Sequence, residues 1–225
     1  MEINFSGRKF VFFPRDEADR SVIGEIFRFR EYRSAERAIA GAQDPILDVG
    51  AHAGFFACYA RALNRKARIF ALEPEPGNFA ALRGHLKENK IAGVKPVQAA
   101  LAPETGKAFL ILSADSHNHR LAEFPNENTI EVRAFSLADF CRKNKIKKIS
   151  VLKMDVEGGE YAIFEGLSPA DLNMANFVIL EYHYSRRYSE IETKLRENGF
   201  GVQVFPSKFD KTMGFLFARN KRFKK

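Results

Sequence analysis

Two hydrophobic patterns divide the chain. Residues 1–14 alternate apolar and polar side chains around a Ser-Gly pair, which predicts a β-hairpin, and a charged stretch of helical pattern follows. From Ile46 onward, short apolar runs alternate with amphipathic segments, as in βαβ units with a parallel sheet. We therefore expect an N-terminal hairpin and helical cap over residues 1–44. A single compact domain should cover residues 45–225.

The strands expected in the second region are short and apolar. Those of the parallel sheet are Ile46–Val49, Arg68–Leu72, Lys95–Leu101, Ser150–Val156 and Asn176–Tyr182. The helices between them begin near Gly54 and cover Pro76–Lys90, Leu137–Lys143 and Tyr188–Asn198. Two further strands, Lys107–Leu112 and Thr129–Phe135, flank a polar loop, Ser113–Asn128. The tail, with Gly201–Phe205 and Gly214–Ala218, predicts an antiparallel hairpin. The expected fold class is α/β, a mainly parallel, doubly wound sheet that ends in this hairpin.

A glycine-containing loop follows the first strand of this sheet. Asp48, Gly50 and Gly54 form a D-x-G-x-x-x-G pattern between the strand and the next helix. Gly50 tolerates a positive φ, so the backbone can turn sharply and approach a ligand, while Gly54 allows the helix start to pack tightly. In open α/β sheets, ligands lie beyond the carboxyl ends of the strands where the strand order switches. The sequence therefore predicts a binding site at this loop.

The residue that ends the next strand narrows the ligand. Glu73 is a carboxylate placed to accept hydrogen bonds from both hydroxyls of a ribose. A dinucleotide-binding loop needs G-x-G-x-x-G, but the required positions after Gly50 hold His52 and Phe55. The loop instead fits a nucleoside without phosphates, with Asp48 placed to attract a cation such as the amino group of methionine. The alternative is that the glycines serve only helix–strand packing.

Charge and cysteine content add little to this picture. The formal net charge of +8, from 36 basic and 28 acidic residues, fits an anionic substrate or nucleic acid, and equally a solubilising surface. Cys58 and Cys141 do not indicate a disulfide framework. No charged-then-apolar leader opens the chain, and no apolar run reaches the ~20 residues of a membrane span. We expect a cytoplasmic location, and the sequence predicts no oligomeric state.

Four sequence blocks together resemble one known family. The blocks are Asp48–Gly54, Leu72–Asn78, Leu152–Glu160 and Ile179–His183. They are similar, in this order, to the D-V-G-A-N-x-G, E-P-x-P, K-x-D-x-E-G-x-E and E-x-H motifs of the FkbM-type methyltransferases. One departure is His52, where the family generally has Asn. An imidazole N–H can also donate to the carboxylate of methionine.

This resemblance implies a Rossmann-like class I methyltransferase fold, with S-adenosyl-L-methionine as the methyl donor. It also implies that the acceptor is usually an oxygen of a small molecule or a sugar. The cofactor-binding residues that we expect are Asp48, Gly50, His52, Gly54, Glu73, Asn78 and Ala100.

The third and fourth blocks carry the candidate acid–base residues. Asp155 comes at the carboxyl end of one buried strand, and Glu181 and His183 come at the end of another. A sulfonium donor requires an aligned acceptor whose proton is removed. Asp155 is the leading candidate for this acceptor-side contact, with His183 or Glu181 as alternative bases. A structural carboxylate paired with Lys153 is the other interpretation of Asp155.

We expect no bound metal, although one alternative stays open. Asp155, Glu157, Glu181 and His183 offer the hard ligands that Mg²⁺ prefers in metal-assisted O-methylation. The polar loop contains a His-Asn-His sequence at residues 117–119, but no Cys or third His accompanies it for zinc. A loop that is solvated or covers the substrate is the preferred interpretation.

Two basic runs support a rival function. Lys143–Lys148 and Lys221–Lys225 are typical of solvated surface, but an RNA methyltransferase would also need basic surface. Against RNA, the sequence lacks the Asn/Asp-Pro-Pro-aromatic motif of base amino-methylation. The non-enzyme alternative is a module that binds the cofactor without catalysis.

Overall fold

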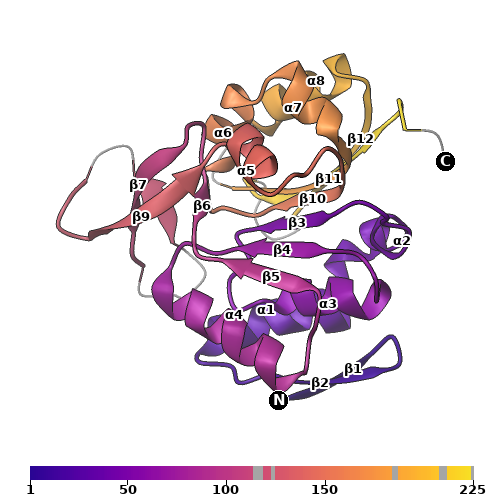
Figure 1. Cartoon of the computed structure of the whole chain (residues 1–225), viewed down its shortest axis with the longest axis vertical. Coiled ribbons are helices and arrows are strands. Elements are labelled where there is room, and N and C mark those ends of the chain that lie inside the picture. The colour runs from indigo at the N-terminus through magenta and orange to yellow at the C-terminus, as the bar shows by residue number, and fades with distance from the viewer. Residues whose placement is uncertain (114–118, 123–124, 184–186, 208–211, 224–225) are drawn as a thin grey trace.

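The fold is an α/β sandwich that matches the expected class. The computed structural model describes residues 1–113, 119–122, 125–183, 187–207 and 212–223. These residues form a seven-stranded sheet with helices on both sides, a four-stranded sheet at one edge, and a two-stranded hairpin (Figure 1).

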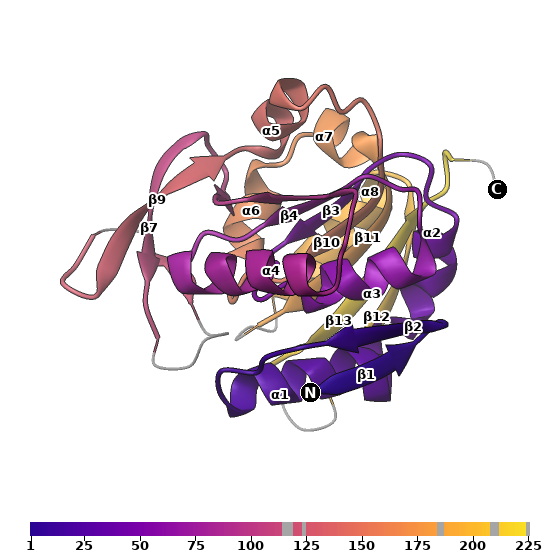
Figure 2. The same ribbon diagram turned by 60° about the horizontal axis from the view of Figure 1, so that its bottom comes forward.

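The N-terminal region is the expected hairpin followed by a helical cap. Its elements are β1 (Glu2–Phe5), β2 (Arg8–Val11), α1 (Glu17–Ile23), η1 (Gly24–Phe29), η2 (Glu31–Ala35) and α2 (Glu36–Ala40). Asp16 caps α1 by accepting a hydrogen bond from the backbone N–H of Asp19. Phe5 stacks on Tyr59 of the main part, with 4.6 Å between ring centroids. The hairpin lies outside α1 and α3 (Figure 2), and the division at residue 44 stays a prediction.

The main sheet has the strand order β12-β13-β11-β10-β3-β4-β5. Its parallel strands are β3 (Ile46–Val49), β4 (Ile69–Leu72), β5 (Val94–Val97), β10 (Ile149–Met154) and β11 (Ala175–Tyr182). The C-terminal hairpin consists of β12 (Phe200–Pro206) and β13 (Gly214–Asn220), and β13 runs antiparallel to both of its neighbours. The strand order switches between β3 and β10, where doubly wound sheets bind their ligands.

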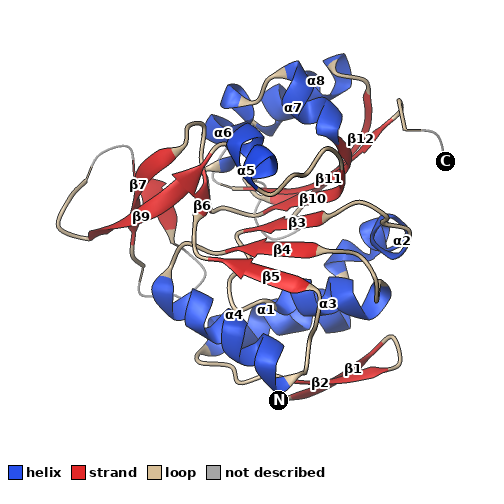
Figure 3. Cartoon of the chain, viewed as in Figure 1, coloured by secondary structure: helices blue, strands red, loops and turns tan. Residues whose placement is uncertain are grey.

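Helices cover the two faces of this sheet (Figure 3). They are α3 (Phe55–Leu63), α4 (Pro76–Glu88), α5 (Leu137–Lys143), α6 (Glu160–Gly166), α7 (Pro169–Met174) and α8 (Tyr188–Glu197). Side chains alternate across a strand, so Ile46 packs with α3 and the cap, whereas Leu47 packs with α5 to α8. By the same alternation, the polar Asp48 lies on the face of α3 and the cap.

The second sheet corrects one predicted strand. It comprises β6 (Ala100–Leu101), β7 (Gly106–Ile111), β8 (Arg120–Ala122) and β9 (Thr129–Phe135), in the order β6-β9-β7-β8. The single strand expected over Lys95–Leu101 is therefore wrong, because β5 and β6 belong to different sheets. The backbone N–H of Ala99 donates to the carbonyl of Val97 at 3.0 Å, a tight turn that redirects the chain. Pro96, which lacks an N–H, is tolerated because β5 is an edge strand.

Two further boundaries also differ from expectation. The strand expected over Ser150–Val156 ends at Met154, because Glu157 and Gly158 adopt positive φ angles of 49° and 92° in the following turn. The loop expected over Ser113–Asn128 contains β8. Residues 114–118 and 123–124 of that loop lie outside the described part of the chain.

Cys58 and Cys141 are both buried free thiols. Within the described ranges, every helix is too short or too polar to cross a membrane.

Candidate functional site

A cavity of about 830 Å³ opens beyond the carboxyl ends of β3, β4, β10 and β11. Its size lies within the roughly 300–1,000 Å³ typical of small-molecule sites. Four parts of the chain line it: the cap, the loops that follow these strands, the second sheet and the C-terminal hairpin. The cavity therefore lies at the strand-order switch, where the sequence predicts a binding site.

A buried lysine links two of the loops beneath this cavity. Lys153 pairs in register with Asp48 of the neighbouring strand. Its Nζ lies 3.3 Å from Asp48 Oδ1 and 3.4 Å from Asp155 Oδ2, and it donates to the carbonyl of Gly50 at 2.8 Å. Burial lowers the pKa of Lys153, but the carboxylates of Asp48 and Asp155 outweigh it and the net shift is upward. Lys153 is therefore a cation that holds both loops together.

The two glycines of the first loop mainly serve packing. Gly50 has φ of 73°, and a Cβ there would overlap the backbone carbonyl oxygen of Asp155. Gly54 has φ of 85°, and a Cβ there would overlap Leu82 of α4. Gly50 lines the cavity, whereas Gly54 does not. Gly50 thus allows the loops after β3 and β10 to touch, and Gly54 allows α3 to approach α4.

Glu73 is held in place at the cavity wall by two backbone groups. Its Oε2 accepts a hydrogen bond from the N–H of His52 at 2.7 Å, and its Oε1 accepts one from Glu75 at 2.9 Å. Burial raises the pKa of Glu73 to about 7 in spite of these bonds. A carboxylate has about four lone-pair sites, so Glu73 keeps capacity to accept the hydroxyls of a ribose.

Asp48 is a second buried carboxylate with unused capacity. It is fully buried, and within the described residues neither of its oxygens makes a hydrogen bond. Burial raises its pKa to about 6, although Lys153 opposes the shift. Asp48 is not part of the cavity lining, and its link to the cavity is Lys153, whose Nζ lies 3.3 Å from Asp48 Oδ1.

The cap holds the first loop from outside. His52 has φ of 49°, a left-handed conformation that His and Asn tolerate better than most residues. Its Nε2 lies 3.4 Å from Asp19 Oδ1 and 3.1 Å from Arg15 Nη2. Arg15 also donates to Asn78 Oδ1 at 2.8 Å, at the start of α4. His52, Asn78 and Ala100 all line the cavity, but the contacts from Arg15 and Asp19 were not foreseen.

His183 lies among four carboxylates. Its Nε2 is 3.8 Å from Asp155, 3.6 Å from Glu157 and 3.9 Å from Glu181, and its Nδ1 is 3.6 Å from Glu160. Burial lowers the pKa of His183, but Glu160 and then the other carboxylates raise it to about 10. At neutral pH the ring is an imidazolium, so it is a poor candidate for a base.

Glu160 holds the backbone of His183 in place. Its fully buried carboxylate accepts hydrogen bonds from the backbone N–H groups of His183 at 2.7 Å and Gly158 at 2.8 Å. The last acid of the third sequence block therefore joins the turn after β10 to the end of β11.

Asp155 and Glu181 complete the acidic floor of the cavity. Burial, followed by the charge of Asp155, raises the pKa of Glu181 well above its ordinary value. One potential metal-ligand atom from each of Asp155, Glu181 and His183 lies within 4.8 Å of the others, so three of the four candidate Mg²⁺ ligands come together. His119 lines the cavity and accepts a hydrogen bond from the N–H of Ser113. His117 lies outside the described residues.

The side of the cavity formed by the cap and the C-terminal hairpin contains residues that sequence patterns did not identify. From the cap come Glu25, Phe29, Glu31 and Tyr32, and from the hairpin come Phe205, Phe215 and Phe217. Partial burial at the rim, and then the carboxylates of Glu25 and Asp155, raise the pKa of Glu31 to about 7. Only the apolar character of the cap and tail was visible in the sequence, because nothing local brings these segments together.

Comparison with known proteins supports the resemblance to the FkbM-type methyltransferases. A family model described as "Methyltransferase FkbM domain" matches residues 48–202. Hexuronic acid methyltransferase AglP of Haloferax volcanii is 26% identical over 205 residues, covering 88% of this chain and 82% of the relative. The 31-O-demethyl-FK506 methyltransferase FkbM of Streptomyces tacrolimicus is 27% identical over 191 residues, covering 71% of this chain and 73% of the relative.

Two solved structures share the fold. Methyltransferase FkbM from Methylobacillus flagellatus KT has a TM-score of 0.58 at 12% identity, covering 92% of this chain and 56% of that one. Magnesium protoporphyrin IX methyltransferase from Synechocystis PCC 6803, solved with bound S-adenosylmethionine, has a TM-score of 0.55 at 10% identity. That match covers 94% of this chain and 87% of the other. At these identities the likeness concerns the fold alone.

Proposed function

This chain belongs to the FkbM family of S-adenosylmethionine-dependent methyltransferases, and we propose that it methylates a hydroxyl oxygen of a small molecule or sugar. The observation that carries the acceptor proposal is the carboxylate-rich floor of the cavity beside the cofactor loops. Two relatives support it through their names, one of which specifies a hexuronic acid and the other a 31-O-demethyl compound.

In this proposal the cofactor lies along the loops after β3 and β4. Glu73 accepts the ribose hydroxyls, while Asn78 and Ala100 line the nucleoside end. The loop from Gly50 to His52 faces the methionine end, with Asp48 beneath it. S-adenosylmethionine supplies an electrophilic methyl group, so the protein has only to align an acceptor and remove its proton.

The acceptor lies over the acidic floor, where Glu181 is our preferred base. Glu181 lines the cavity, and its carboxylate lies 3.9 Å from His183 and can take up a proton when it is ionised. Asp155, by contrast, has both carboxylate oxygens close to cations, with Lys153 at 3.4 Å and His183 at 3.8 Å. We therefore assign the orientation of the acceptor hydroxyl to Asp155 and the proton to Glu181.

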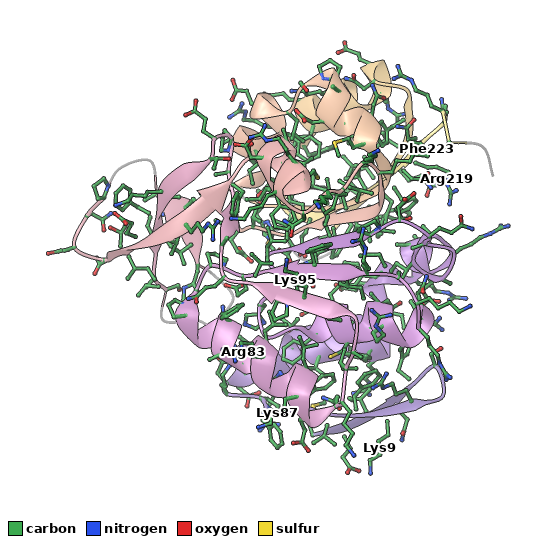
Figure 4. The ribbon with its side chains drawn as sticks, in the orientation of Figure 1. Lys9, Arg83, Lys87, Lys95, Arg219 and Phe223 are labelled. Carbon is green, nitrogen blue, oxygen red and sulfur yellow. The ribbon has the colours of Figure 1, made fainter. Side chains whose placement is uncertain are left out.

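The charge distribution disfavours the RNA alternative at this site. Lys9 and Lys87 lie at the lower edge of the molecule in Figure 4, and the labelled Arg83 and Lys95 are exposed as well. The cavity, in contrast, is lined by several carboxylates. A phosphodiester backbone would be attracted to the exterior and repelled at the reaction site.

A direct test combines cofactor binding with methyl transfer. Isothermal titration should show S-adenosylmethionine and its demethylated product binding at micromolar-scale affinity, with no competition from NAD. Transfer of a labelled methyl group should then be detected with members of a sugar and polyol panel, and base-stable products would identify an ether. Binding without turnover across a broad panel would favour the non-catalytic module.

A further inference from the structure

The charge inside the cavity is opposite to that of the chain as a whole. The protein has 36 Lys and Arg residues and a formal net charge of +8. Among the described residues that line the cavity, Lys153 is the one Lys or Arg. Outside the cofactor loops, the lining carboxylates are Glu25, Glu31, Asp155, Glu157 and Glu181. The net positive charge of the chain is therefore no argument for an anionic acceptor.

The cations near the floor are already engaged. Lys153 lies between Asp48 and Asp155, and it donates to a backbone carbonyl. His183 faces Asp155, Glu157, Glu160 and Glu181 at 3.6–3.9 Å. A carboxylate or phosphate on the acceptor would enter a partly desolvated site where like charges repel more strongly than in water.

Aromatic rings form the walls above this floor. Phe29 of η1 and Phe205 of β12 line the cavity and remain 69% and 47% exposed. Tyr32 contacts Phe215 edge-on, and Phe205 contacts Phe217 in the same way, each with 5.6 Å between ring centroids. The cap and the hairpin thus meet through rings that offer apolar surface to a bound molecule.

We infer that the acceptor is an uncharged hydroxyl compound with an apolar face, and that a carboxylate on it is disfavoured. This inference rests on the proposed function, because it describes the acceptor of that same site. It separates this chain from the relative named for a hexuronic acid, whose acceptor is acidic. The acidic floor takes hydroxyl groups, and the rings of the cap and hairpin cover the apolar face.

The test uses two probes that differ in one group. They are 4-nitrophenyl β-D-glucopyranoside and 4-nitrophenyl β-D-glucuronide. At the same position of the sugar ring, the first carries a neutral hydroxymethyl group and the second carries a carboxylate. Turnover is measured as the rate at which the demethylated cofactor product forms, with a chelator present. Binding is measured separately on protein loaded with S-adenosylhomocysteine. The glucoside should exceed the glucuronide at least about tenfold in kcat/KM and in affinity.

Matched variants locate the effect in the cavity. Above about pH 8, where a carboxyl group with a pKa of about 7 is ionised, Glu31→Gln removes one negative charge at the rim and should narrow the glucoside-to-glucuronide ratio of kcat/KM. Glu17→Gln removes the same charge on α1, where the side chain is 93% exposed and outside the lining, and should leave the ratio unchanged.

The outcomes separate this inference from the proposed function. Equal or better use of the glucuronide, in turnover or in binding, overturns the inference while leaving methyl transfer intact. Failure of both probes to bind also overturns it. Preferential binding of the glucoside without turnover on any hydroxyl acceptor supports the inference and contradicts the proposed reaction.

Discussion

The two halves of the cavity are built in different ways. The proposed cofactor half comes mainly from residues 48–78, with Ala100 added from β6, and within that stretch Glu73 is fixed by the backbone of His52 and Glu75. The acceptor half joins the cap, the ends of β10 and β11, and the C-terminal hairpin. A local motif can therefore identify the methyl donor. The acceptor is specified by charges and rings that only long-range packing brings together.

The sharpest test of this comparison is removal of the proposed base. Glu181→Gln preserves the shape of the side chain but cannot take the proton, so turnover should fall by ~10²–10⁴-fold. The cofactor dissociation constant should change by less than about threefold, since Glu181 belongs to the other half. Single-turnover methyl transfer and titration calorimetry on the same variant measure both. An equal loss in both quantities would show that the halves are not separable.

The reciprocal test concerns the cofactor half. Glu73→Ala removes a charged hydrogen-bond acceptor worth ~1.5–3 kcal/mol, so the dissociation constant of S-adenosylmethionine should rise ~10- to 100-fold. Glu88→Ala, at the exposed end of α4, is the control and should bind normally. An unchanged constant in folded Glu73→Ala protein would remove Glu73 from the ribose site.

Asp155 distinguishes orientation of the acceptor from support of the scaffold. Asp155→Asn should reduce turnover by about tenfold or more while the melting temperature changes little. Lys153 keeps Asp48 at 3.3 Å and the carbonyl of Gly50 at 2.8 Å, so it is not left unpaired. A stability loss of ~3–5 kcal/mol with near-normal turnover would instead mark Asp155 as a partner that the buried lysine requires.

The buried carboxyls of the cofactor half predict a smaller, pH-dependent effect. Burial raises the pKa of Glu73 from 4.5 to about 7, so the folded state binds a proton that the unfolded state has already released. This contribution to stability is present below about pH 4.5 and is lost as the pH rises through about 7. As the pH rises from about 4.5 to about 7, the melting temperature of the Glu73→Gln variant should therefore fall less than that of the wild type. If plots of melting temperature against pH ran parallel for the two proteins, the raised pKa of Glu73 would be contradicted.

The smallest effect is expected from metal removal. Lys153 and the imidazolium of His183 already neutralise part of the acidic floor, and a divalent ion would have to displace the ring proton. Treatment with a chelator should therefore leave turnover within about twofold. Loss of activity that Mg²⁺ restores would establish Asp155, Glu181 and His183 as a metal site instead.

Local patterns determined most of the fold. The strand Ile46–Val49 and the C-terminal hairpin were visible because period-two alternation and apolar runs reflect burial directly. The break between Val97 and Ala100 was not, since both sides are equally apolar and a single turn hydrogen bond redirects the chain. The early end of the strand after Met154 also follows from a turn with positive φ angles, which the residue types do not require.

The sequence by itself predicted a donor site, because the glycines and the acidic residue lie within one stretch of backbone. It also identified Asp155, Glu181 and His183 as candidates. Only the tertiary structure decided the charge of His183, since its pKa depends on carboxylates from the turn after β10, from β11 and from α6. In the same way, the acidic, ring-walled acceptor cavity exists only where the cap and the hairpin meet. Charge and shape at a site depend on distances in space, which residues far apart in the sequence acquire only on folding.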